Sequence, residues 1–185
     1  MNEKSINNIK EENRRKLKKQ ERVERLRKWY KELKRNKKCS NCGKKGEEIL
    51  DFHHVNPNKK KYSISRMVSL GCSKGKIARE ISKTIILCSC CHRIHHDQER
   101  AIQGKKRNLS KIQKVISALK KDKKCLYCNI SRACALDFHH RNPEDKKFSI
   151  GNAIKMKLSE EDIINESKKC DLICSNCHRS LHLRT

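Results

Sequence analysis

An internal repeat with a period of 86 residues limits what this chain can fold into. The segment LDFHH at 50–54 recurs at 136–140, and the CxxCHR segment at 88–93 recurs at 174–179, without insertion or deletion between them. Both prolines of the chain, Pro57 and Pro143, fall in the same register. We therefore expect two copies of one small structural unit.

The repeat begins before the first cysteines, at apolar residues with helical spacing in both copies. Val23, Leu26, Trp29, Tyr30 and Leu33 align with Leu109, Ile112, Val115, Ile116 and Leu119. The expected organisation is a basic N-terminal helical extension over 1–22, a first module over 23–96, a polar linker over 97–108 and a second module over 109–182.

Within each module the pattern predicts a small α+β fold. The expected order is a helix, a CxxC knuckle, a short strand pair around LDFHH, a loop opening with Asn-Pro, a helix, a short apolar strand and a second knuckle. The run Ser159-Glu160-Glu161-Asp162 predicts a capping box at the internal helix of the second module. We also expect a helix after Cys91, because no helix breaker follows until Gly104.

The chain has twelve cysteines among 185 residues, and the redox state of its compartment determines whether they form disulfides or bind metal. The N-terminus MNEKSINNIK lacks the apolar segment of a secretory signal, and no stretch approaches the length of a membrane span. We therefore expect an intracellular protein, in the cytoplasm or in a host cell's cytoplasm or nucleoid. In such a reducing compartment, metal coordination explains many cysteines better than disulfides do.

Eight cysteines form two sets of paired CxxC turns, which suit tetrahedral zinc. The first set is Cys39, Cys42, Cys88 and Cys91, and the second is Cys125, Cys128, Cys174 and Cys177. A module of about 75 residues is small enough to need such a metal for stability. Structural zinc is therefore expected in both modules.

The remaining cysteines are Cys72, Cys90, Cys134 and Cys170, and none has a cysteine at the matching position. We expect small buried or exposed thiols at these positions. Cys90 could compete as a ligand because it lies between Cys88 and Cys91, but the matching residue Asn176 argues against this.

Eight of the nine histidines recur in the same register and indicate a second kind of site. Each module has an adjacent pair, at 53–54 or 139–140, and a pair four residues apart, at 92 and 96 or 178 and 182. Imidazoles at i and i+4 of a helix lie on one face and can converge on one ion. Two other interpretations stay open, namely that His92 or His96 is an alternative zinc ligand, or that each pair is a packed polar cluster.

The order CxxC, then LDFHHxNP, then CxxCHRxxH resembles the HNH or ββα-metal nucleases on a treble-clef zinc scaffold, and in particular small proteins with the L-[DE]-F-H-H pattern. The resemblance covers both modules and implies two tandem ββα-metal units. It implies that His54 and His140 are general bases. It also implies that His53, His92 and His96, and in the second module His139, His178 and His182, are ligands of a catalytic ion, which would be Mg²⁺, Mn²⁺ or another transition metal with up to one ion per module.

The resemblance further implies hydrolysis of phosphodiester bonds, with 5′-phosphate and 3′-hydroxyl products. Asp51 and Asp137 lie two residues before the first histidine of each strand, so they share its face and either orient it or form a structural cap or salt bridge. In the family that the sequence resembles, the middle Asn of the motif helps to hold the base. Between the His-His pair and the second knuckle its matched counterparts are Asn56 and Asn142 alone, which stand unusually close to the histidines.

The charge of the chain points to nucleic acid as its partner. The sequence carries 47 Lys+Arg against 21 Asp+Glu, a formal charge of +26, and a field of that sign attracts polyanions. A membrane surface is a poorer fit, because no amphipathic helix shows an aromatic-rich apolar face. The expected backbone contacts are Arg93, Arg179, Lys60, Lys61, Lys146 and Lys147.

Three functions fit these observations. The first is a metal-dependent endonuclease that acts on DNA rather than RNA and has two similar sites. The second is a non-catalytic zinc protein derived from such modules that only binds DNA or RNA. The third, a zinc domain for protein interaction, would leave the charge of +26 without a role.

Overall fold

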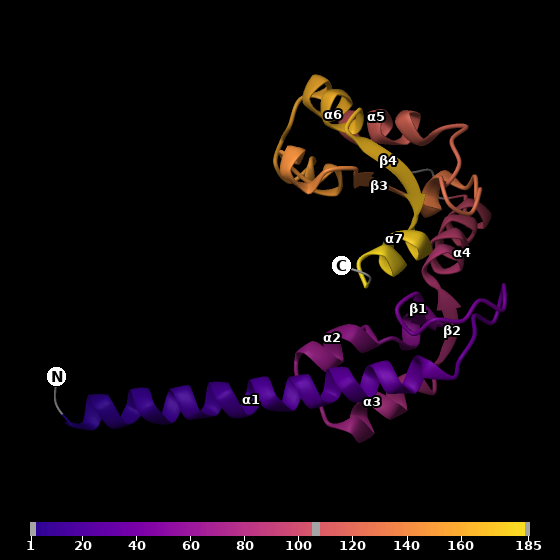
Figure 1. Ribbon diagram of the computed structural model, residues 1–185. Coiled ribbons are helices and arrows are strands. Elements are labelled where there is room, and N and C mark those ends of the chain that lie inside the picture. Colours follow the sequence, from indigo (N-terminus) through magenta and orange to yellow (C-terminus); the bar gives the residue numbers. More distant parts are fainter. Residues whose placement is uncertain (1–2, 105–107, 184–185) are drawn as a thin grey trace. The chain divides into compact units, whose positions relative to one another are not determined.

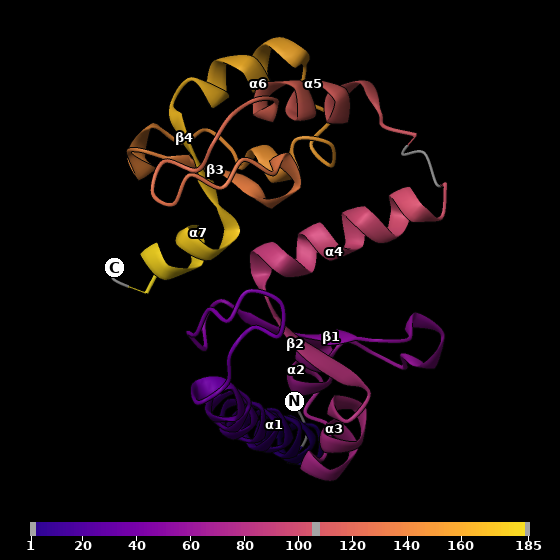
Figure 2. The same cartoon turned by 90° about the vertical axis from the view of Figure 1, so that its right-hand side faces the viewer.

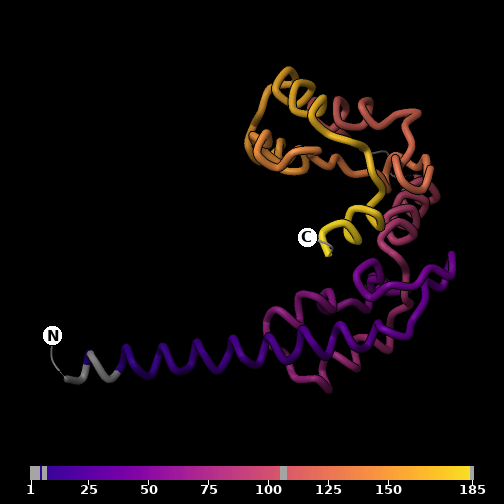
Figure 3. Tube along the Cα trace, viewed as in Figure 1, coloured from indigo at the N-terminus to yellow at the C-terminus, as the bar shows by residue number. Residues whose placement is uncertain are grey.

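The chain begins with a single long helix, α1 (Glu3–Arg35), in a stretch that contains neither glycine nor proline. Ion pairs one turn apart, such as Glu12–Lys16 at 2.7 Å and Glu32–Arg35 at 2.9 Å, lie along its surface. Residues 8–22 are all exposed, and the tube in Figure 3 shows that the helix runs without a break from this half into the next. The predicted basic extension and the first helix of the first module are therefore one helix.

The computed structural model describes residues 3–104 and 108–183, which form two compact units, Met1–Leu87 and Cys88–Thr185. Each unit combines helices with strands of a two-stranded sheet, which confirms the predicted small α+β class. Residues 105–107 of the predicted linker lie outside the described residues. The predicted module limits, 23–96 and 109–182, stay predictions.

In the first unit, helices α2 (Ile64–Ser69) and α3 (Lys74–Ile81) lie against the C-terminal half of α1, as Figure 1 shows. Serines begin both helices by accepting a hydrogen bond from a backbone amide of the first turn. The core consists of Leu26, Ile64, Met67, Val68 and Ile77, with Trp29, Tyr30 and Phe52 packed around it. Apolar residues predicted to form one helix face in α1 thus supply one wall of this core.

In the second unit, helices α5 (Lys111–Lys120) and α6 (Glu160–Ser167) lie side by side (Figure 2). Both begin with a capping box, at Ser110 and at Ser159, and the second of these confirms the prediction from sequence. The buried core is Ile150, Ala153 and Ile163, lined by Ile112, Val115, Ile116, Leu119 and Phe138. The two units therefore use matching positions of the repeat for their cores.

The sheets have two strands each. Strand β1 (Leu50–His54) pairs with β2 (Thr84–Cys88), and β3 (Leu136–His140) pairs antiparallel with β4 (Cys170–Cys174), with Leu136 opposite Cys174. The prediction of a local strand pair around LDFHH is therefore wrong. The chain just before β3 forms a 3-10 turn (Ala133–Ala135) rather than a strand, and the partner of β3 is the later apolar segment.

The second knuckles lead directly from strand into helix. Helix α4 (Ser89–Ile102) follows β2, and α7 (Ser175–Leu181) follows β4. The helix predicted after Cys91 is confirmed, and it continues through part of the predicted linker. In the described ranges, no helix is both long enough and apolar enough to cross a membrane.

Two neighbouring isoleucines of α6 test the core of the second unit. The side chain of Ile163 is fully buried, whereas Ile164 is 39% exposed. We expect Ile163→Ala to lower the free energy of unfolding by about 2–5 kcal/mol, because it leaves a cavity. Ile164→Ala makes the same change of helix propensity and should cost far less. Equal losses for the two variants in chemical denaturation of the zinc-loaded protein would contradict this core.

Candidate functional site

The structure brings the eight predicted zinc ligands together in two clusters of four. In each cluster the sulfur atoms all lie within 4.8 Å of one another, and no ion needs to be assumed to obtain this spacing. In tetrahedral zinc with Zn–S bonds of about 2.3 Å, sulfurs stand about 3.8 Å apart. Both clusters are therefore close enough to bind zinc.

The second cluster shows how local structure aims the sulfurs. Cys174 ends β4, and its Sγ accepts a hydrogen bond from the backbone amide of Cys177 in the first turn of α7, at 3.4 Å. The Sγ of Cys125 accepts one from the amide of Cys174, at 3.1 Å. The strand end, the helix start and the CxxC turn thus meet at the sulfurs.

The charges of this cluster favour a cation. Burial raises the pKa of the Cys125 thiol, but hydrogen bonds from the backbone amides of Cys174 and Cys128 outweigh it and lower the pKa to about 7. Burial and the neighbouring cysteines raise the pKa of Cys177 to about 11. A second thiolate is disfavoured beside the first unless a positive ion lies between them.

Of the remaining cysteines, Cys170 donates to the carbonyl of Glu166 at 3.5 Å, and Cys90 contacts two residues of α7. The backbone amide of Cys90 donates to Oδ1 of Asn176 at 3.1 Å, and its Sγ lies 3.4 Å from Oγ of Ser175. Cys90 is not a member of either four-cysteine cluster. Cys72, Cys134 and Cys170 are partly buried and also lie outside the clusters.

Three predicted imidazoles of the second repeat converge. A ring nitrogen of His139 in β3 and those of His178 and His182 at the end of the chain lie within 4.8 Å of one another. The ring centroids of His178 and His182 are 4.9 Å apart, as expected one helical turn apart. Neutral imidazoles in this arrangement match the donor set of a transition metal.

The matching histidines of the first repeat meet the same criterion. The ring nitrogens of His53, His92 and His96 lie within 4.8 Å of one another, and Nε2 of His92 is 3.2 Å from Nε2 of His96. Burial lowers the pKa of His96, which favours the neutral imidazole that a metal requires. His95 and Glu99 form a further such set with His53, which the sequence analysis left out.

Asp137 connects the second histidine set to a cation. One carboxylate oxygen accepts from Nη1 of Arg93 at 2.7 Å, and the other lies 3.5 Å from Nδ1 of His178. Burial alone would raise the pKa of Asp137, but the hydrogen bonds from His178 and Arg93 lower it to about 2. The ionised carboxylate therefore accepts from Nδ1–H and leaves Nε2 of His178 available to an ion. Asp51 is half-buried at the matching position of β1.

A basic cavity surrounds these groups in the second unit. Its lining includes the four histidines 139, 140, 178 and 182 with Arg93, Lys120, Lys146 and Arg179, and Asp137 is its carboxylate. Of the other predicted nucleic-acid contacts, Lys60, Lys61 and Lys147 are exposed. The cavity therefore offers cations and neutral imidazoles to an anionic ligand.

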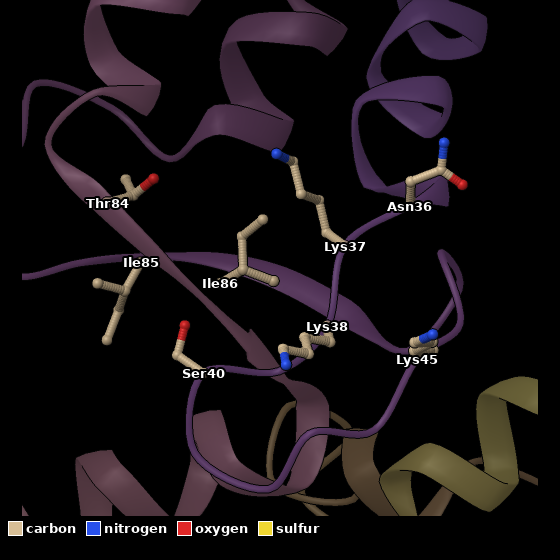
Figure 4. A pocket seen from close by; sticks show the side chains of 8 residues that line it. All are labelled: Asn36, Lys37, Lys38, Ser40, Lys45, Thr84, Ile85 and Ile86. Carbon is tan, nitrogen blue, oxygen red and sulfur yellow. The ribbon is translucent and has the colours of Figure 1, made fainter.

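A second basic hollow lies beside the first CxxC turn. Figure 4 shows Lys37, Lys38 and Lys45 around it, together with Ser40 and the exposed Ile85 of β2. The Lys37-Lys38 pair follows α1, and Lys45 lies across the turn, where Lys38 and Lys45 form an isolated bridge. The sequence analysis did not single out these lysines.

Sequence reasoning also missed charged residues buried at matching positions. Glu80 and Glu166 are 3% and 1% exposed, and each holds a predicted base, His54 at 3.0 Å and His140 at 2.8 Å. The Nζ of Lys120 donates to the carbonyl of Leu136, and Lys34 does the same to Leu50. The two glutamates are 86 residues apart, and so are the two lysines. The repeat in the sequence was therefore the signal that could have found them.

The asparagines that were the nearest counterparts of the family's middle Asn have another task. Oδ1 of Asn56 accepts from the amide of Asn58, and Oδ1 of Asn142 accepts from the amide of Glu144. Each caps the 3-10 turn that follows, at Pro57–Lys59 or Pro143–Asp145. These amide oxygens are thus occupied by the chain itself.

Comparison with models of known families, with curated proteins and with solved structures found no match for this chain.

The zinc content of single variants tests the cysteine clusters. We expect the purified chain to carry two zinc ions by native mass spectrometry and Cys125→Ser to carry one, because a ligand of the second cluster is lost. Cys134→Ser is the control, since Cys134 lies outside both clusters, and it should keep two. A parent without zinc, or an equal loss in both variants, would refute the assignment.

Proposed function

We propose that this chain is a metal-dependent endonuclease of the HNH type, with two tandem ββα-metal modules that hydrolyse phosphodiester bonds of DNA. One observation carries the proposal. Next to each cluster of four cysteines lie three converging imidazoles and a fourth, buried histidine on the adjacent residue of the strand. A protein in which zinc serves only as a scaffold does not require a set of histidine ligands beside the cysteines. Such a set in both repeats is harder still to explain by a scaffold alone.

The residues of the second module suggest how the reaction would run. His140 would take a proton from water, and the resulting hydroxide would attack phosphorus in line as the bond to the 3′ oxygen breaks. The departing oxygen then takes a proton from solvent, which leaves 5′-phosphate and 3′-hydroxyl ends. Arg93, Lys146 and Arg179 line the same cavity and would hold the phosphates on either side.

The donor set fits a divalent ion. Three imidazole nitrogens within 4.8 Å of one another match Mn²⁺, Ni²⁺ or Zn²⁺ by affinity, whereas Mg²⁺ would act there through its abundance. Bound there, such an ion would offset the negative charge that develops on the phosphoryl and departing oxygens. Asp137 would orient His178 toward it through Nδ1.

A second candidate function is binding of nucleic acid without cleavage. The exposed half of α1 and the lysines of Figure 4 favour it, because they offer positive charge and no histidine is among the described residues that line that hollow. The two functions share the polyanion and differ in whether the histidines act on it.

Plasmid cleavage tests the proposal directly. With Mg²⁺ or Mn²⁺ added, we expect the parent to convert supercoiled DNA to nicked or linear product, and the His54→Ala/His140→Ala variant to lose at least about 100-fold in rate, because it lacks both bases. The two proteins are compared at matched zinc content and DNA affinity. Tight binding without cleavage by either would support the second function.

The salt dependence of DNA binding tests the polyanion contacts common to both functions. The logarithm of the binding constant should fall with the logarithm of salt concentration, with a slope of several units. Lys146→Gln should reduce that slope by about one, since Lys146 lines the cavity. Lys155→Gln is the matched control, because Lys155 is exposed but does not line the cavity. A binding constant that does not change with salt concentration would instead favour a protein-interaction domain.

A further inference from the structure

Two buried carboxylates remain without a role in the proposed reaction. Glu80 lies in α3 and Glu166 lies in α6, and their side chains are almost completely buried. Glutamate is seldom buried unless it is paired, because removing a carboxylate from water is costly. The groups that pair with Glu80 and Glu166 therefore indicate what these carboxylates do.

Three kinds of donor are common to both carboxylates. In the second repeat, Oε1 of Glu166 lies 2.8 Å from Nε2 of His140 and 2.8 Å from the amide of Lys147, and Oε2 lies 2.8 Å from Nζ of Lys169. The corresponding distances of Glu80 are 3.0 Å to His54, 2.9 Å to the amide of Lys61 and 2.7 Å to Lys83. The arrangement is thus repeated in both units.

Both glutamates are ionised at neutral pH. The hydrogen bond from Lys83 is the main cause that lowers the pKa of Glu80, to about 2, against the effect of burial. Burial raises the pKa of Glu166, but the donors Lys169, Lys147 and His140 together lower it to about 2. An ionised carboxylate has no proton to donate, so the histidine Nε2 carries the hydrogen.

We propose that Glu80 and Glu166 are positioning residues that fix His54 and His140 in the Nε2–H tautomer and leave Nδ1 as the atom that accepts a proton. This inference rests on the proposed nuclease function. The carboxylate would also stabilise the imidazolium once the proton has been taken, as a buried carboxylate does for the histidine of a hydrolase triad.

This role answers the departure from the family motif. The side-chain oxygens of Asn56 and Asn142 cap a turn, so these oxygens do not hold the base. The glutamates come from the helix that precedes the second knuckle and reach the base directly. Each also accepts from the backbone of Lys61 or Lys147, which joins the base to the loop that carries the expected phosphate contacts.

The test compares two double variants of the full, zinc-loaded chain. Glu80→Gln/Glu166→Gln keeps the side-chain shape but removes the negative charge, and we expect the single-turnover cleavage rate to fall by about 10- to 100-fold. The DNA dissociation constant and the zinc content should stay within about twofold, because neither the lysines nor the cysteines change. Such a split between rate and binding is not expected of a residue with a structural role alone.

Lys83→Met/Lys169→Met is the control, since it removes the other ion pair of the same carboxylates and leaves the histidine contact. If the carboxylates serve only as buried anchors, this variant should lose as much activity as the glutamine variant. A parent rate in the glutamine variant, or equal losses in the two, would overturn the positioning role. A parent that cleaves no DNA would overturn the proposed nuclease function instead.

A second measurement on the unsubstituted chain does not depend on how the variants fold. In ¹⁵N-histidine NMR, the couplings of the ring nitrogens to ring protons identify the tautomer, and His54→Asn and His140→Asn spectra assign the two signals. We expect hydrogen on Nε2 in both. Hydrogen on Nδ1 would overturn the positioning role even if the parent cleaves DNA.

Discussion

In each repeat, four sulfur atoms that lie within 4.8 Å of one another bring the two CxxC turns together, and the histidine-bearing segments follow from these turns. In the second unit they join the end of β4, the start of α7 and the CxxC turn, three segments that the small core of Ile150, Ala153 and Ile163 does not reach on its own. The direction of α7 follows from its first turn, and with it the direction of His178. A structural metal at these sulfurs would therefore orient the histidines without touching them.

Around that anchor, the second unit separates its charges by depth. The carboxylate of Glu166 is almost completely buried and has four hydrogen-bond donors, while Asp137 lies half-buried between Arg93 and His178. Of the cations that line the cavity, Arg93 and Lys146 are more exposed than either carboxylate. Glu166 and Asp137 lie against His140 and His178, and the cations line the cavity beside them, so one small unit accommodates both signs of charge.

The sequence predicted much of this arrangement because spacing was enough to do so. The cysteine and histidine sets, the helix after Cys91 and the capping box at Ser159 depend on local geometry or on the repeat. The partner of the LDFHH strand was missed because strand pairing over a long loop leaves no local signal. The burial of Glu166 was missed because a lone glutamate in a charged helix normally faces water, and only tertiary packing shows otherwise.

The contact between Cys90 and Asn176 joins equivalent positions of the two repeats, since they are 86 residues apart. In a symmetric dimer of identical chains, a residue on such an axis meets its own copy and must be compatible with itself. Here Cys90 offers a backbone amide and Asn176 offers a side-chain oxygen, and cysteine at both positions could not make this hydrogen bond. Because the two copies belong to one chain, these two positions need not carry the same residue. Each can therefore change in sequence independently of the other.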